Sequence, residues 1–138
     1  MISIDAVAKY AAGLPGVTVG ARWGNRTWQV GDRGFMWQRP FSKADLKRFG
    51  DAPAPAGDIL AVIVENLDAK DALLAMKLPG FFTIEHFRGY AAVLIALKVA
   101  RTAHVRAAIA DAHRVAVAAD MVKKPKRKPA ARRRAKRA

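Results

Sequence analysis

The chain has 138 residues, enough for one domain with a single hydrophobic core. It contains no cysteine, which excludes a disulfide scaffold and cysteine-bound zinc and is consistent with a reducing compartment. No signal-peptide pattern opens the chain, and no apolar run reaches the roughly 20 residues of a membrane span. We therefore expect a cytoplasmic protein that does not enter a membrane, associated with the nucleoid if it is bacterial.

The net charge of +14 lies mostly at the C-terminus. From Lys123 onward the chain reads KKPKRKPAARRRAKRA, which holds 10 of the 25 basic residues and no acidic one, so 15 basic residues face 11 acidic ones in the rest. We predict a folded domain over 1–121 and a disordered basic tail over 122–138. Such a tail is typical of proteins that neutralise polyanions, although a tail that only aids solubility, or a nuclear localisation signal, has the same composition.

The first elements are predicted to be a helix and a three-stranded meander. Ser3 and Gly13 mark the ends of an amphipathic helix. Alternation over 17–23 predicts a strand with Val17, Val19, Ala21 and Trp23 on one face. A turn at Gly24 and Asn25 and a second turn over 31–34 then connect strands over 26–30 and 35–39.

A second helix is predicted over 43–49. Ser42 is a suitable N-cap, Asp45 favours the positive end of the helix dipole, and Gly50 is a natural stop. In this helix we expect Leu46 and Phe49 to face inward and the three cations to face solvent.

The remaining elements are two helices and the strands between them. The apolar run ILAVIV, 59–64, predicts a strand buried on both faces. Asp68 is a candidate N-cap for a helix to about Lys77 that buries Leu73, Leu74 and Met76. Strands over 81–84 and 90–99 enclose a reversal at EHFRG, 85–89, and Thr102 is expected to cap a long helix to about Val122.

Four segments resemble the MmcQ/YjbR family: PGV (15–17), WGNRTWQVGDRGFMWQRP (23–40), SKADLKRFGDA (42–52) and FFTIEHFRGYAAVLIAL (81–97). The resemblance spans about residues 1–120. It implies a CyaY-like α+β fold, in which helices pack on one face of an antiparallel sheet and two hairpins form a double wing proposed to bind DNA. The alanine-rich last helix and the basic tail depart from that family.

His86, beside Glu85, is the only candidate for catalysis. Adjacent strand residues point to opposite faces, so Glu85 cannot easily orient His86, and no nucleophile motif accompanies the pair. We expect His86 to hold the turn, with nucleic-acid contact and catalysis as alternatives. His104 and His113 lie nine residues apart on opposite helix faces, and the first helix has only Asp5 as an acid, so we expect neither zinc nor iron. The tryptophans at positions 23, 28 and 37 suit core packing better than base stacking.

We therefore expect a monomeric, non-enzymatic protein that binds nucleic acid, DNA rather than RNA, without cofactor or metal. Binding should be largely electrostatic and weakly sequence-selective, with most of the affinity from the basic tail. The alternative is a protein-interaction or small-ligand-binding domain with a solubilising tail. The residues expected to contact phosphate are Arg22, Arg26, Arg33, Lys43, Lys47, Arg48, Arg88, Lys123, Lys124, Lys126, Arg127, Lys128, Arg132, Arg133, Arg134, Lys136 and Arg137.

Overall fold

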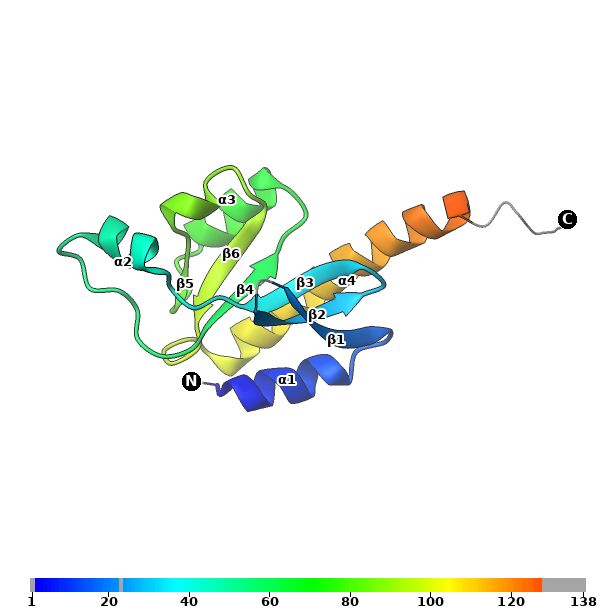
Figure 1. Ribbon diagram of the computed structural model, residues 1–138, viewed down its shortest axis with the longest axis horizontal. Coiled ribbons are helices and arrows are strands. Elements are labelled where there is room, and N and C mark those ends of the chain that lie inside the picture. The colour runs from blue at the N-terminus through cyan, green and yellow to red at the C-terminus, as the bar shows by residue number, and fades with distance from the viewer. Residues whose placement is uncertain (1, 23, 128–138) are drawn as a thin grey trace, which may run out of the picture.

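The predicted α+β fold is confirmed by a computed structural model that describes residues 2–22 and 24–127 (Figure 1). Six strands form one antiparallel sheet in the order β1-β2-β3-β4-β6-β5. The helices are α1 (Ile4–Ala12), α2 (Lys43–Phe49), α3 (Leu67–Ala75) and α4 (Thr102–Arg127), and the short 3-10 helix η1 covers Glu85–Phe87. The strands are β1 (Val17–Arg22), β2 (Asn25–Val30), β3 (Arg33–Gln38), β4 (Ile59–Ile63), β5 (Phe81–Phe82) and β6 (Ala92–Ala96).

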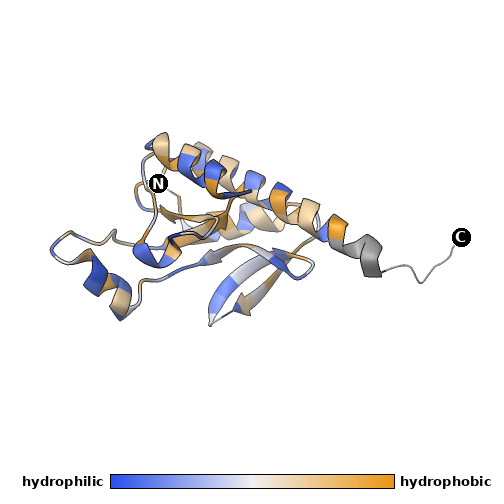
Figure 2. Ribbon diagram, turned by 90° about the horizontal axis from the view of Figure 1, so that it is seen from above, coloured by the Kyte–Doolittle hydropathy of each residue, from blue (hydrophilic) through white to orange (hydrophobic). Residues whose placement is uncertain are grey.

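Helices α1 and α4 lie side by side, and α4 covers β2, β3 and β4 (Figure 2). Val105, Ile109, Ala112 and Ala116 of α4 are fully buried, and their spacing of three to four residues places them on one face of the helix. Because the alanine side chains are small, this face can lie close to the sheet. The predicted packing of helices on a face of the sheet is confirmed by this layer.

The centre of the sheet is buried on both faces. All residues of β4 are buried, as the apolar run over 59–64 predicts, and all residues of β6 are buried as well. On β3, Trp37 contacts the rings of Phe87 and Tyr90, whose centroids lie 6.5 and 6.3 Å away. The segment around η1 therefore covers part of the sheet in addition to the α1 and α4 layer.

A β-bulge in β3 directs Trp37 toward that segment. Trp28 pairs with Met36 and Gln29 pairs with Gly34, so Phe35 is the extra residue. Phe35 lies edge-on to the ring of His113 in α4, with ring centroids 5.7 Å apart. Since a bulge changes the alternation of side chains, Trp37 can contact η1 although Phe35, two residues earlier, contacts α4.

The β1–β2 hairpin is less buried than its alternation predicts. Arg22 pairs with Asn25, so Asn25 belongs to β2 rather than to the turn in which it was expected, and Gly24 has a φ of +77°. Val19 is 57% exposed. The alternation does not bury this residue because β1 is an edge strand and has only a short contact with α1. Trp23 lies outside the described residues.

The orientation predicted for α2 was wrong in one respect. Leu46 is 49% exposed and Asp45 is the buried residue of the helix, whereas Phe49 packs inward against Phe41, with ring centroids 5.2 Å apart. Lys43, Lys47 and Arg48 are exposed, as expected. The hydrogen bonds that Asp45 accepts turn this carboxylate, rather than the leucine, toward the protein.

Helix α3 also differs from its prediction. Asn66, not Asp68, is the N-cap, and its side chain accepts a hydrogen bond of 2.8 Å from the backbone N–H of Ala69. Met76 is 64% exposed, whereas Lys70 is the buried residue of the helix. The apolar pattern did not indicate this because the buried surface of α3 is partly polar.

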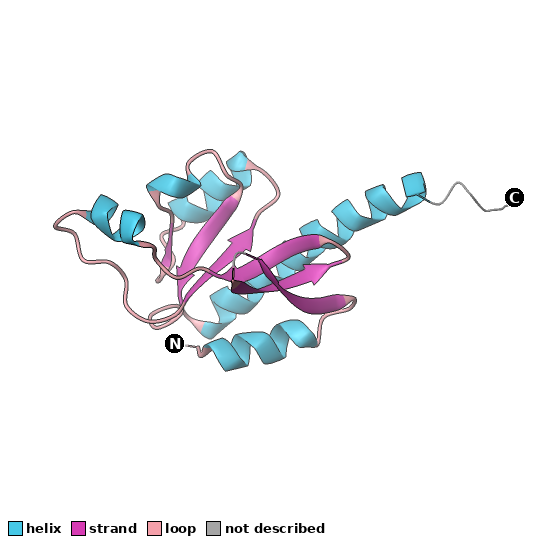
Figure 3. Ribbon diagram, in the orientation of Figure 1, coloured by secondary structure: helices cyan, strands magenta, loops and turns pink. Residues whose placement is uncertain are grey.

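The hairpin expected around 81–99 is present, with Phe81 opposite Ile95 and Phe82 opposite Leu94. Its strands are shorter than predicted, and the reversal contains η1 rather than a tight turn (Figure 3).

Helix α4 continues to Arg127, five residues beyond its expected end, and extends past the edge of the sheet (Figure 1). The added residues are Lys123, Lys124, Pro125, Lys126 and Arg127. Lysine and arginine are favoured near a helix C-terminus, whereas proline opposes the extension because it has no backbone N–H. The boundary predicted at 121/122 thus lies within this helix, and the rest of the basic tail, 128–138, lies outside the described residues. Over the described part of the chain, no helix is long and apolar enough to cross a membrane.

Candidate nucleic-acid interface

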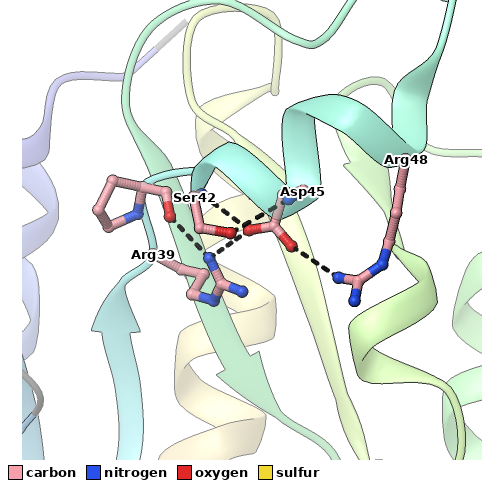
Figure 4. A network of polar contacts seen from close by, with 5 residues as sticks. Arg39, Ser42, Asp45 and Arg48 are labelled. Atoms are coloured by element: carbon pink, nitrogen blue, oxygen red, sulfur yellow. Dashed lines mark hydrogen bonds and ion pairs between the residues drawn. The ribbon is translucent and has the colours of Figure 1, made fainter.

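A polar network fixes the start of α2 (Figure 4). The Asp45 carboxylate accepts hydrogen bonds from the Ser42 backbone N–H at 2.9 Å and from Arg39 Nη1 at 2.8 Å. In return, the Ser42 hydroxyl accepts one from the Asp45 backbone N–H at 3.1 Å, which completes a capping box. Arg48 Nη1 lies 3.6 Å from the other carboxylate oxygen.

This network keeps Asp45 charged. Burial alone would raise the pKa of Asp45, but the hydrogen bonds from Ser42 and Arg39 and the positive charge of Arg39 outweigh burial and lower the pKa below its usual value. The only acidic side chain of α2 is thus buried and neutralised. The surface that α2 presents to solvent carries Lys43, Lys47 and Arg48, and the one carboxylate of the helix lies beneath it, 2.8 Å from Arg39 and 3.6 Å from Arg48.

A pocket of about 870 Å³ opens between α2 and η1, and we call it the α2 pocket. One wall is aromatic: Phe87 and Tyr90 meet edge to face at 5.4 Å, and Trp37 lies beside both. The guanidinium of Arg39 lies 5.6 Å from the centre of the Phe87 ring. The lining residues are Asn25, Trp37, Arg39, Pro40, Phe41, Ser42, Ala44, Asp45, Arg48, His86, Phe87 and Tyr90.

Lys70 of α3 supports the aromatic wall from behind. Its Nζ donates hydrogen bonds to the backbone carbonyls of Phe87 at 2.7 Å and Tyr90 at 2.8 Å. Only 5% of the residue is exposed. Burial lowers the pKa of Lys70, and the nearby carboxylate of Asp71 opposes part of that effect. The lysine therefore joins α3 to the segment that carries both rings.

His86 does not have the role expected from the sequence. Among the described residues its ring makes no hydrogen bond, and it is exposed at the rim of the α2 pocket. Glu85 pairs with Arg88 at 2.9 Å instead of orienting the imidazole. The turn is held by Lys70, whose long side chain reaches the carbonyls from another helix.

The arginines of the first hairpins are not grouped on one surface. Ala21 pairs with Arg26 and Arg22 pairs with Asn25, so Arg22 and Arg26 point to opposite faces. Arg22 donates to the carbonyl of Asp32, next to exposed Arg33. Arg26 donates to Gln38 at 3.2 Å and lies over the Trp28 ring at 5.2 Å.

The other predicted phosphate contacts lie on α2, beside η1, at the end of α4 and beyond the described residues. The structure places Lys43, Lys47 and Arg48 together on α2, whereas Arg88 is exposed beyond η1 in its pair with Glu85. Lys123, Lys124, Lys126 and Arg127 belong to the last turns of α4, and the structure describes no contacts of their side chains. Lys128, Arg132, Arg133, Arg134, Lys136 and Arg137 lie outside the described residues.

Trp28 and Trp37 belong to the core, and His113 lies at its edge. Trp28 is 1% exposed, which confirms core packing, and Trp37 is 9% exposed at the base of the α2 pocket. His113 Nε2 lies 2.8 Å from the carbonyl of Pro15. Within the described ranges, no three histidine or acidic side chains are placed to hold a metal ion.

The sequence did not indicate the roles of Arg39, Lys70 and Tyr90. Arg39 stands three residues before the N-cap Ser42, and no helical or strand spacing relates it to Asp45. Lys70 lies within a helix whose neighbouring residues give no sign of its burial. Tyr90 is part of the His-Phe-x-Gly-Tyr turn, but its position beside Trp37 depends on pairing between distant strands.

Comparison with known proteins identifies bacterial relatives. No family model matches the sequence, and no solved structure matches it either. The uncharacterized proteins Rv2570 and MT2646 of Mycobacterium tuberculosis and Mb2600 of Mycobacterium bovis are each 40% identical to it over 100 residues. The matched region covers 70% of this chain and 74% of each relative. The chain belongs to the family that includes these mycobacterial proteins.

Proposed function

We propose that the protein is a non-enzymatic nucleic-acid-binding domain of the MmcQ/YjbR type. In this proposal the surface of α2 and the basic tail contact phosphates, and the tail supplies most of the affinity. Binding is largely electrostatic and has little sequence selectivity.

The observation that carries the proposal is the one-sided charge of α2. Its three cations face solvent, and its one carboxylate is buried against Arg39 and Ser42. These cations are available to phosphate because the one acid of the helix is buried and bound closely to Arg39, and Arg48 lies only loosely, at 3.6 Å, from that carboxylate. Arg88, by contrast, is already paired with Glu85 and is a weaker candidate.

The fold agrees with this proposal in two respects. In the β1–β2 hairpin, the edge strand β1 is mostly exposed, as a wing that contacts DNA would need to be. Helix α4 carries the start of the basic tail away from the sheet, where it can follow a phosphate backbone (Figure 1). Helix α2 has only seven residues and presents two lysines and an arginine, so it supports backbone contact rather than the reading of base edges.

Fluorescence anisotropy with a labelled DNA duplex tests the proposal. If six to ten cations engage phosphates, the affinity of the full chain should fall about a thousandfold or more between 50 and 200 mM salt. An acidic polypeptide, polyglutamate, serves as a competitor that has negative charge but no phosphate. Absence of binding at 50 mM salt, a salt-insensitive complex, or equally strong binding to polyglutamate would contradict a nucleic-acid function.

A further inference from the structure

We infer that the α2 pocket binds one unpaired nucleotide, whose base stacks on the aromatic wall while its phosphate meets Arg48. This inference rests on the proposed nucleic-acid function and adds a site to it. The ligand chemistry is a planar heteroaromatic ring joined to a phosphate, which is supplied either by a free nucleotide or by an unpaired position in a strand.

The wall offers a ring surface that solvent reaches. Tyr90 is 47% exposed, and its ring is held from behind by Phe87 and Trp37 at 5.4 and 6.3 Å. Phe87 is 3% exposed, so it supports the wall without being available to a ligand. An exposed ring backed by buried rings is the arrangement on which bases stack, and such stacking tolerates any base because every base has a π face.

The charge of the pocket suits an anion. Its lining contains two guanidinium groups, Arg39 and Arg48, and one carboxylate, Asp45, which leaves one net positive charge. Asp45 is bound closely to Arg39 at 2.8 Å and only loosely to Arg48 at 3.6 Å. The Arg48 side chain is 47% exposed, whereas that of Arg39 is 16% exposed. Arg48 is therefore the group that can meet an incoming phosphate.

The pocket is also formed in advance. The capping box and the Arg39–Asp45 pair fix one side, and the two hydrogen bonds from Lys70 fix the other. A site held by its own network loses little conformational freedom when it binds, which favours a small ligand. Its volume of about 870 Å³ is within the range of small-molecule sites.

The test uses the full chain and three probes. These are adenosine monophosphate in calorimetry and, in anisotropy, a labelled duplex that is fully paired and the same duplex with one unpaired adenine. We expect the unpaired adenine to increase affinity. Tyr90→Ala should weaken binding to the probe with the unpaired adenine about tenfold and leave binding to the paired duplex unchanged. Tyr90→Phe, which keeps the ring, should bind like the original protein.

Arg48→Gln and Lys47→Gln form a matched pair on one helix, because only Arg48 lines the pocket. Both substitutions remove one charge and should weaken the paired duplex alike. Only Arg48→Gln should further weaken the probe with the unpaired adenine, by up to about fivefold. Tyr10→Ala on α1 controls for the loss of an aromatic ring elsewhere.

The outcomes separate the inference from the function on which it rests. If the protein prefers the duplex with the unpaired adenine, and if this preference depends on Tyr90 and Arg48, the result supports both the pocket and the nucleic-acid function. It also shows that the bound nucleotide is part of a strand. Binding of the mononucleotide alone, with the same dependence, supports the pocket but overturns the proposed DNA function. Equal binding of both duplexes, unaffected by Tyr90→Ala, overturns the pocket and leaves the function intact. No binding of any probe overturns both.

Discussion

Gly80 shows how closely one residue can be restricted by the fold. Its φ is +83°, and a Cβ there would lie 2.7 Å from the carbonyl oxygen of Ala96 and 3.0 Å from the Cβ of Ala100. Both the backbone conformation and the space therefore require glycine. Gly80→Ala should destabilise the protein by about 3 kcal/mol or more, measured by urea unfolding.

Gly89 provides the control because its φ is +73° and no atom lies within 4 Å of an added Cβ. Gly89→Ala should cost only the backbone strain of about 1 kcal/mol. Equal losses for the two variants would show that the contacts at Gly80 are not the cause.

Asp45 should make stability depend on pH in the acid range. Its pKa is lowered in the folded protein, so between that lowered value and the unfolded value of about 3.9 the unfolded chain binds more protons. Stability from this group is thus complete above the unfolded pKa and is lost as pH falls through the folded one. Asp45→Asn should cost about 2 kcal/mol at pH 7 and make the decline below about pH 4 shallower.

Urea unfolding at a series of pH values measures both effects. Exposed Asp51, just beyond α2, supplies the control, and Asp51→Asn should leave the profile close to that of the original protein. A profile for Asp45→Asn as steep as the original would contradict the assigned network.

At the scale of elements, Lys70 connects α3 to the η1 segment. Lys70→Met keeps the apolar stem but removes both hydrogen bonds, which leaves the carbonyls of Phe87 and Tyr90 without that donor. We expect a loss of about 3 kcal/mol and faster amide hydrogen exchange over 85–90. Lys9→Met at an exposed position of α1 is the control. Unchanged exchange over 85–90 in Lys70→Met would show that the lysine does not hold this segment.

Most elements could be predicted from local signals, whereas their orientations could not. Ser3, Ser42 and Gly50 marked helix ends because capping depends on nearby residues. The bulge at Phe35, the burial of Asp45 and the reach of Lys70 depend on contacts between distant segments. We predicted that Leu46 faces inward because the helical pattern depends on hydrophobicity alone. That pattern cannot indicate that a carboxylate becomes buried together with an arginine.

The same limit applies to the candidate site. The exposed cations of α2 could be predicted from composition and helical spacing. The α2 pocket could not, because Trp37, Arg48 and Tyr90 come from three separate segments that meet only after β3, α2 and η1 are in place. Charge patterns identify surfaces that can meet phosphate, but they do not show where aromatic rings stand beside them.

At the scale of the whole molecule, charge is distributed between the folded domain and the basic tail. Ten basic residues lie from position 123 onward, so loss of three charges anywhere should weaken binding to a polyanion somewhat. A surface that contacts phosphate directly should lose more than this general effect. This difference separates a domain that takes part in binding from one that only carries a tail.

The most direct test compares two full-length variants with equal charge loss. One is Lys43→Gln/Lys47→Gln/Arg48→Gln on α2, and the other is Lys9→Gln/Lys77→Gln/Arg101→Gln on other exposed positions. In salt titrations with labelled duplex, we predict that the α2 variant reduces the slope of log affinity against log salt by about 3, and that the control variant changes it little. Identical slopes for the two variants would contradict the claim that the α2 surface contacts phosphate.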